Sequence, residues 1–253
     1  MPDERESPRR GAPDWRGLPD FEKYERWVRE VPGGWWDLRG PIGGLHVLNR
    51  ARVVYFREKM GGFKGKKILD VGCGGGILAE SLAADGAVVV GVDPSTASIR
   101  VAQEHAAGEG LPIEYRVGFA EQLDFREDFD VVFAVDVLEH VEDLGATLSA
   151  CARALRPEGF FGFLTHNQTL EAFRFLIWEQ EYVEGIMPKG AHDFHKFLTP
   201  GALSSALERV GISSVEVRGL TRTGQGGAQE ISLSDDVSIS YLGFGLRRGS
   251  GPR

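Results

Sequence analysis

The sequence predicts a Rossmann-like α/β protein: a mainly parallel seven-stranded sheet with helices on both faces and an N-terminal helical cap. Two observations lead to this fold class. From Lys66 onward, short apolar runs alternate with helical stretches, which is typical of parallel strands joined by right-handed helical crossovers. The first apolar run, at Ile68 to Val71, leads into the glycine-rich run Gly72 to Gly76, as in sheets that bind a ligand at their carboxyl edge.

The elements follow in chain order. Residues 1–18 and 249–253 carry Pro, Gly and Arg with few groups to bury, so we expect two disordered tails. Residues 19–63 form the cap, with a helical pattern best supported over Val47 to Met60. Residues 64–248 form the sheet domain, with strands expected at 66–71, 87–92, 113–117, 129–135, 159–165, 214–220 and 237–247. Helices are expected at 77–85, 95–108 and 144–155, near 169–184 and near 200–210.

Composition limits the function classes. The 253 residues carry a net charge of −8 and a pI near 5.4, without a basic stripe, which argues against a general nucleic-acid binder. The two cysteines, Cys73 and Cys151, match neither a disulfide framework nor a zinc site, so a reducing cytoplasm is expected. No stretch approaches the ~20 apolar residues of a membrane-spanning helix. We therefore expect a cytoplasmic protein, at most peripheral to the inner face of the membrane.

The glycine loop favours S-adenosylmethionine (SAM) over a dinucleotide. Its glycines alternate from Gly72, whereas the dinucleotide pattern Gly-x-Gly-x-x-Gly would place a glycine at Ile77. Glycine leaves no Cβ between the backbone and a ligand, and the helix that follows points its N-terminus at the loop. Asp70, two residues before Gly72, would repel a pyrophosphate but suits the ammonium and sulfonium of SAM. An NAD-linked oxidoreductase is therefore disfavoured.

A second carboxylate, Asp93, supports this cofactor site. It ends the apolar run Ala87 to Val92, about 20 residues after the first glycine, where an acid binds a ribose diol. Taken singly, Asp70 is equally explained as a helix-capping residue, Asp93 as an N-cap before Pro94, and the glycine loop as a tight turn. The combination of all three features favours the cofactor site.

Three polar side chains, Asp136, Glu139 and His140, follow the fourth strand. If the segment is a turn of helix, they stand at i, i+3 and i+4 and share one face. We expect these residues to be catalytic and to hold one divalent cation, Mg²⁺ with Zn²⁺ or Mn²⁺ as alternatives. In the competing interpretation, Asp136 caps the turn, Glu139 is solvated and His140 orients a neighbour. Without a metal, His140 alone would be the general base.

Five motifs extend beyond general features of SAM-binding folds. They are Trp35-Trp36-Asp37, the run Leu45 to Arg52, the glycine loop through Ser81, Leu138-Glu139-His140-Val141 and the run Pro188 to Phe197. Together they resemble the ubiquinone-biosynthesis O-methyltransferase family of class I SAM-dependent methyltransferases, over about Trp35 to Tyr241. That family methylates catechol-type hydroxyls on polyprenylated rings. The resemblance implies an O-methyltransferase acting on a quinone precursor such as a polyprenylated demethylubiquinol, with the cation as a Lewis acid.

By that similarity, Arg52, Gly72, Asp93 and Val135 fall on cofactor-contacting positions. The full expected cofactor-binding set adds Asp70, Gly74, Gly76 and Glu121. The expected substrate and lid residues are His166, Trp178, His192 and Asp193. Arg52 has a plain alternative as a solvated helix residue.

The chain departs from the family pattern in places. Asp136 stands where the family usually carries Glu, Val135 where Met is common and Ala191 where Thr is usual, and the string at 165–168 also differs. The changes at 165–168 and 191 leave the acceptor open. O-, N- or C-methylation of an aromatic secondary metabolite therefore stays an alternative. So does a non-catalytic SAM-binding subunit of a quinone-biosynthesis complex, and the oligomeric state is not indicated.

Residues 168–198 are expected to form a lid or a membrane-facing insertion. The helix near 169–184 presents more apolar surface than one core-facing stripe requires, including Phe175 and Trp178. It either dips into a membrane interface to accept a prenylated substrate or packs over the active site, since Arg174 is its one basic residue. His192 and Asp193 either close over the substrate or form plain loop structure.

Overall fold

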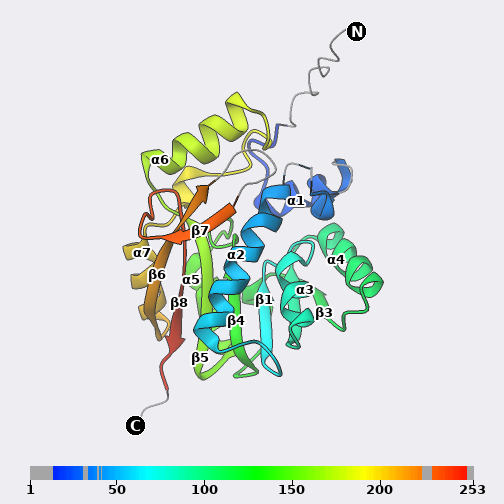
Figure 1. The fold of residues 1–253 in the computed structure, drawn as a ribbon, viewed down its shortest axis with the longest axis vertical. Coiled ribbons are helices and arrows are strands. Elements are labelled where there is room, and N and C mark those ends of the chain that lie inside the picture. The colour runs from blue at the N-terminus through cyan, green and yellow to red at the C-terminus, as the bar shows by residue number, and fades with distance from the viewer. Residues whose placement is uncertain (1–13, 31–33, 39, 41, 224–229, 250–253) are drawn as a thin grey trace.

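The computed structural model describes residues 14–30, 34–38, 40, 42–223 and 230–249. One sheet runs through the molecule in the order β3-β2-β1-β4-β5-β8-β6-β7 (Figure 1). The strands are β1 (Lys67–Val71), β2 (Val88–Asp93), β3 (Glu114–Val117), β4 (Phe129–Val135), β5 (Leu155–His166), β6 (Ile212–Thr223), β7 (Glu230–Ser234) and β8 (Ser240–Arg247). The predicted α/β class is confirmed, although the sheet has eight strands instead of seven.

The first five strands form a parallel half, as predicted. β1 pairs with β2 and β4, β2 pairs with β3, and β4 pairs with β5. From β1, the chain adds β2 and then β3 on one side of the sheet. It then returns and adds β4 on the opposite side of β1. The carboxyl ends of β1 and β4 therefore flank the crevice where open α/β sheets bind ligands.

Helices cover both faces of this sheet, which explains why its strands read as continuous apolar runs. On one face, α2 (Gly43–Met60), α3 (Ile77–Ala84) and α4 (Thr96–Gly108) pack around a core that includes Phe56 and Phe133. On the other face, α5 (Leu144–Ala154) and α7 (Pro200–Arg209) pack around a core that includes Leu148 and Leu207.

The other half of the sheet is antiparallel and differs from the prediction. β8 pairs antiparallel with β5 and β6, and β6 continues into a pairing with β7. The sequence analysis misses β7, although residues 230–234 alternate between polar and apolar side chains, because so short a run is weak evidence on its own. Its strand conformation depends on the pairing with β6.

The cap contains α1 (Asp20–Glu30), the short 3-10 helix η1 (Gly34–Trp36) and α2. Residues 1–13 and 250–253 of the expected tails lie outside the described residues. For residues 14–18 the prediction of disorder is wrong. Trp15 is 1% exposed, packs edge-on against Trp27, and donates its backbone N–H to the Lys189 carbonyl. The buried indole therefore joins the N-terminal segment to the cap.

The helix predicted near 169–184 is present with an unusual backbone. A short α6 (Leu170–Ala172) continues into η3 (Phe173–Val183), a π-helix, and η4 (Phe194–Lys196) follows after a loop. π-helical turns are rare and often occur at functional sites. Within the described ranges, no helix is both long enough and apolar enough to cross a bilayer.

Candidate active site

A cavity of about 550 Å³ lies at the carboxyl ends of β1, β2 and β4. Part of its lining comes from the glycine loop (residues 72–76) and from cap residues such as Trp35. Further lining comes from His166 at the end of β5, from η3, and from Leu220 and Ile231 on the β6–β7 pair. The volume is typical of a small-molecule site.

The glycine loop needs glycine for two reasons. Its backbone takes φ values of 69°, 51° and 88° at Gly72, Gly74 and Gly76, a region that side chains rarely adopt. It is also closely packed, because a Cβ on Gly72 would lie 2.3 Å from Val137 and one on Gly74 would lie 2.7 Å from the Trp35 ring. Gly76 is the N-cap of α3, so that helix begins at the loop.

Asp70 and Asp93 lie beside this loop. Asp70 is 3% exposed, and its Oδ2 makes no hydrogen bond within the described residues. Asp93 accepts the backbone N–H groups of Gly74 at 2.9 Å and Ser95 at 2.8 Å. Burial raises the pKa of Asp70 to about 7 and the pKa of Asp93 to about 6. A cationic ligand would offset the cost of these buried carboxylates.

Arg52 is not a solvated helix residue. It is 5% exposed, its Nη1 donates to Asp136 Oδ2 at 2.6 Å, and its Nε donates to Asn49 Oδ1 at 2.8 Å. Its charge also opposes the rise in the pKa of Asp70 that burial causes. Arg52 therefore connects the Asp70 side of the cavity to the turn after β4.

The turn after β4 is not helical, and the predicted metal site is not formed. Asp136 has a φ of 54°, and its side chain points to Arg52. Glu139 accepts the Thr165 hydroxyl at 2.7 Å, while His140 contacts α1. Across the described part of the chain, no group of three or more His, Cys, Asp or Glu side chains is arranged to hold a metal ion. The i, i+3, i+4 reasoning is wrong here because it assumes a helix.

Glu139 is not solvated either. It is 1% exposed, and its Oε1 lies 3.5 Å from His166 Nε2. Burial, with a smaller contribution from the charge of Asp136, raises the pKa of Glu139 to about 8. Burial also raises the pKa of Asp136. Burial therefore favours the protonated form of Glu139.

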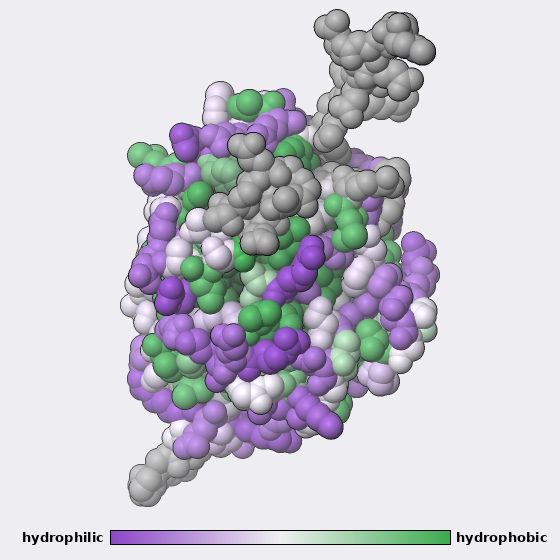
Figure 2. All heavy atoms as spheres, viewed as in Figure 1, coloured by the Kyte–Doolittle hydropathy of each residue, from purple (hydrophilic) through white to green (hydrophobic). Residues whose placement is uncertain are grey.

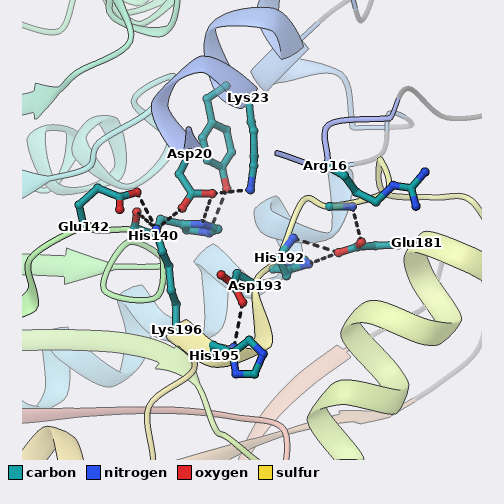
Figure 3. A network of polar contacts seen from close by, with 12 residues as sticks. Arg16, Asp20, Lys23, His140, Glu142, Glu181, His192, Asp193, His195 and Lys196 are labelled. Carbon is teal, nitrogen blue, oxygen red and sulfur yellow. Dashed lines mark hydrogen bonds and ion pairs between the residues drawn. The ribbon is translucent and has the colours of Figure 1, made fainter. Parts of the chain in front are cut away.

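Three imidazoles lie together in the cavity lining (Figure 3 shows two of them). The His192 ring centroid lies 6.1 Å from that of His140 and 5.4 Å from that of His166. Each ring has a polar partner: Tyr24 Oη at 3.1 Å for His140 Nε2, Ser240 Oγ at 2.9 Å for His166 Nδ1, and Glu181 Oε1 at 3.0 Å for His192 Nδ1. Burial lowers the pKa of His140, so that ring is neutral at pH 7.

The remaining predicted residues divide into two groups. Glu121 and Val135 line the cavity, whereas Gly76 is not among the lining residues and serves as the N-cap of α3. Trp178 and Asp193 are not among the lining residues: Trp178 is 55% exposed, and Asp193 accepts the His195 backbone N–H at the start of η4.

Sequence reasoning misses several residues of the site. Asp20 and Tyr24 of α1 and Glu181 of η3 contact the imidazoles, but no local spacing signals this. Tyr24 and His140, for example, are 116 positions apart. Trp35 belongs to a motif of the family resemblance, yet its packing on the glycine loop becomes visible only in the fold.

Comparisons with known proteins identify the family of this chain. Residues 69–163 match a family model described as a methyltransferase domain. The chain is 37% identical over 235 residues to the ubiquinone biosynthesis O-methyltransferase of Methylobacterium nodulans, which covers 88% of this chain and 93% of that protein. It is 39% identical over 210 residues to the protein of the same name from Pseudomonas fluorescens, covering 82% and 89%.

Solved structures share the fold at lower identity. Magnesium protoporphyrin IX methyltransferase from Synechocystis with bound S-adenosylhomocysteine (SAH) aligns with a TM-score of 0.63 at 21% identity, covering 89% of this chain and 94% of that one. At this identity the likeness shows the fold alone. The curated relatives, which align over nearly their whole length, show more: the chain belongs to the ubiquinone biosynthesis O-methyltransferase family and is a SAM-dependent O-methyltransferase.

Proposed function

We propose that this enzyme methylates a phenolic, catechol-type hydroxyl of a quinone precursor such as a polyprenylated demethylubiquinol. The observation that carries the proposal is the cavity, whose lining includes both the glycine loop with its two carboxylates and the three imidazoles. A methyl donor and an aromatic acceptor can therefore meet inside it. The names of the relatives, which refer to ubiquinone biosynthesis, support this choice of acceptor.

The residues around the glycine loop fit SAM. Gly72 and Gly74 line the cavity with bare backbone, the unpartnered Oδ2 of Asp70 suits the ammonium group of SAM, and Asp93 suits the ribose diol. When bound, SAM supplies an electrophilic methyl group. The protein's contribution is to orient the acceptor oxygen and to remove its proton.

His140 is the best candidate for the general base. A phenol has a pKa near 10, so the anion at pH 7 is about one part in a thousand, or roughly 4 kcal/mol of barrier. Burial lowers the pKa of His140, so the neutral ring can accept a proton. Its Nε2 is already hydrogen-bonded to a phenol, the hydroxyl of Tyr24, at 3.1 Å. Base catalysis contributes about 10²- to 10⁴-fold, and positioning supplies much of the rest.

Metal assistance does not fit this arrangement. The carboxylate of Asp136 is engaged by Arg52 at 2.6 Å, and that of Glu139 accepts the Thr165 hydroxyl at 2.7 Å. These two carboxylates and His140 do not form a group that could hold a cation. The proposed mechanism therefore passes through no metal ion.

The acceptor side of the cavity suits an isoprenoid tail. Its apolar lining includes Phe175, Leu176, Met187, Leu220, Ile231 and Ile239. The helical segment that supplies the first two also exposes apolar side chains to solvent: Leu170, Phe173, Trp178, Tyr182 and Val183. Figure 2 shows hydrophobic and hydrophilic residues intermixed at this end of the molecule. This segment is suited to resting on a membrane surface and receiving the tail there.

Flotation with vesicles of phosphatidylethanolamine and phosphatidylglycerol tests membrane contact. We expect the protein to float with the vesicles and Trp178→Asp to lose most of that binding. Val54→Asp is the matched control, because Val54 is a similarly exposed apolar residue on α2. Equal flotation of all three proteins, or of none, would remove the membrane proposal.

Incubation with methyl-labelled SAM and a panel of catechols, followed by mass spectrometry, tests the reaction. We expect one label on a phenolic oxygen of a prenylated catechol. His140→Gln should reduce kcat by about 100-fold or more, while isothermal titration shows unchanged binding of SAH. Label on carbon or nitrogen, or no transfer by protein that binds SAH, would contradict the proposal.

A further inference from the structure

Helix α1 brings a buried acidic side chain to the imidazole of His140. Asp20, the first residue of α1, is 7% exposed, and its Oδ1 lies 3.7 Å from His140 Nδ1 (Figure 3). Nδ1 is itself buried and makes no hydrogen bond within the described residues. The gap is slightly longer than a hydrogen bond, and such contacts in free enzymes often shorten in the substrate complex.

Asp20 is held in its ionised form. Lys23 Nζ lies 2.6 Å from Oδ1, and Lys196 Nζ lies 2.7 Å from Oδ2. Burial alone would raise the pKa of Asp20, but His140 and these two ammonium groups outweigh burial and hold it well below the usual range. Lys196 also contacts Glu142 at 2.7 Å and the His140 carbonyl at 3.4 Å, so it joins α1 to the turn after β4.

The opposite nitrogen of the ring contacts Tyr24, which lines the cavity together with His140. Nε2 of His140 lies 3.1 Å from Tyr24 Oη, one turn along α1 from Asp20. A proton on Nδ1, facing the Asp20 carboxylate, leaves a lone pair on Nε2 that accepts the Tyr24 hydroxyl. This is the tautomer that a base for a phenolic substrate requires.

We propose that Asp20 is a positioning residue for the methyl-transfer reaction: it orients the His140 ring so that Nε2 faces the acceptor hydroxyl, in the place that the Tyr24 hydroxyl marks. The proposal rests on the proposed function, in which His140 is the base. Other charged or titratable groups also face this ring. They are Lys23 on α1, His192 on the loop before η4, and Asp136 on the same turn.

A purely structural role of Asp20 would affect the variants differently from a positioning role. Asp20 would then serve only as an ion-pair partner that fixes α1, and its loss would weaken the fold whether or not His140 is present. A positioning role acts through His140 alone, so the effects of the two substitutions on kcat should not multiply.

The experiment compares Asp20→Asn, His140→Gln and the double variant, using a short-chain prenylated catechol as acceptor. We expect Asp20→Asn to lower kcat by about 10- to 100-fold and to leave SAH affinity within about twofold. In the His140→Gln background the same change should cost less than about twofold, and Asp20→Glu should recover part of the activity. Glu25→Gln is the control. Glu25 anchors the same helix through Ser95 Oγ and Ala97 N, and its loss should change kcat by less than about twofold.

The outcomes separate two failures. If His140→Gln retains turnover, the base assignment of the proposed function fails. If His140→Gln loses turnover but Asp20→Asn does not, or if their effects multiply, the role of Asp20 is overturned. Nitrogen-15 NMR of the wild-type protein adds a readout that needs no variant to fold. We expect the proton on Nδ1 of His140, and a proton on Nε2 instead would overturn the proposal.

Discussion

At the residue scale, the two carboxylates beside the glycine loop predict how ligand binding depends on pH. The pKa values of Asp70 and Asp93, about 7 and about 6, mean that both lose their charge in mildly acidic buffer. A cation binds the ionised forms, so SAM affinity is full above these pKa values and falls below them. We expect weakening of up to about tenfold per pH unit for each linked group.

Isothermal titration with SAM between about pH 8 and about pH 5.5 measures this dependence. Asp70→Asn is the control, because it should bind SAM more weakly at pH 8 and show a flatter profile. Wild-type affinity that stays constant over the whole range would contradict the assignment of these carboxylates to the cation.

Glu139 predicts an effect on stability. A carboxyl has a pKa near 4.3 in an unfolded chain, whereas the folded value here is about 8. Stability is therefore lost as the pH rises between these values, because only the unfolded chain ionises freely. Glu139→Gln removes that penalty while keeping an acceptor for the Thr165 hydroxyl.

We expect Glu139→Gln to raise the free energy of unfolding by about 1–2 kcal/mol in mildly alkaline buffer and to have little effect near pH 5. Urea denaturation at the two pH values measures the difference. A Gln variant that is less stable than the wild type in alkaline buffer would show that Glu139 is ionised and paired in the fold.

Local spacing found Asp70, Asp93 and His140, because each follows an apolar run that reads as a strand. It failed for the metal site, since the positive φ of Asp136 turns that side chain to Arg52. It also missed Asp20, because the contact of this residue with His140 depends on where the folded cap places α1. Residues at strand ends are therefore predictable from spacing, whereas partners brought by the cap are not.

At the element scale, the glycine loop and the cap are packed as one unit. Gly75 illustrates this: a Cβ there would lie 2.2 Å from Trp35 Cγ, and its carbonyl accepts the Trp36 indole N–H at 3.0 Å. Gly75→Ala should displace η1 and weaken SAH binding by at least about tenfold, an effect of more than 1 kcal/mol.

Gly108→Ala is the matched control for this change. Gly108 ends α4, and a Cβ at this position would meet no neighbouring atom within 4 Å, so alanine should stabilise the helix by about 0.5–1 kcal/mol. Isothermal titration and thermal unfolding give both readouts. Unchanged SAH binding by Gly75→Ala would show that the cap and the loop are not coupled.

The loop between η3 and η4, which the sequence analysis expects to act as a lid and which is called the lid loop below, depends on one residue of η3. Glu181 is 1% exposed and accepts the Gly190 N–H at 2.7 Å and both the N–H and Nδ1 of His192 at 3.0 Å. Glu181→Ala leaves these donors unpaired, so we expect a loss of about 2–4 kcal/mol in stability. The KM for the acceptor should rise several-fold, with SAH affinity unchanged.

Glu179→Ala is the control on the same helix, because Glu179 forms a more exposed pair with Arg174 at 3.6 Å. It should change stability by no more than about 0.5 kcal/mol. Steady-state kinetics and thermal unfolding of the two variants test the role of Glu181. Equal effects would show that the lid loop does not depend on that carboxylate.

Elements with strong local patterns were predictable, and elements held by tertiary pairing were not. β1, β2 and β4 appear in the sequence as apolar runs because both faces of the parallel half are covered. β7 depends on β6, and the buried Trp15 segment depends on a contact with Lys189 far along the chain. Periodicity also gives the presence of η3 but not its π-helical hydrogen bonding.

At the scale of the whole molecule, three parts of different origin enclose one cavity. The parallel half of the sheet supplies the glycine loop and the turn after β4. The cap supplies Asp20, Tyr24 and Trp35, and the antiparallel half with η3 supplies the apolar lining. In the proposed function, this arrangement places a site for a cationic donor next to a base and an apolar acceptor site.

A crystal structure with SAH and a prenylated catechol is the sharpest test that donor and acceptor meet in this cavity beside His140. We expect SAH against the glycine loop beside Asp70 and Asp93, with a phenolic oxygen of the acceptor at about 3 Å from His140 Nε2. SAH bound elsewhere, or an acceptor whose hydroxyls lie away from His140, would contradict it.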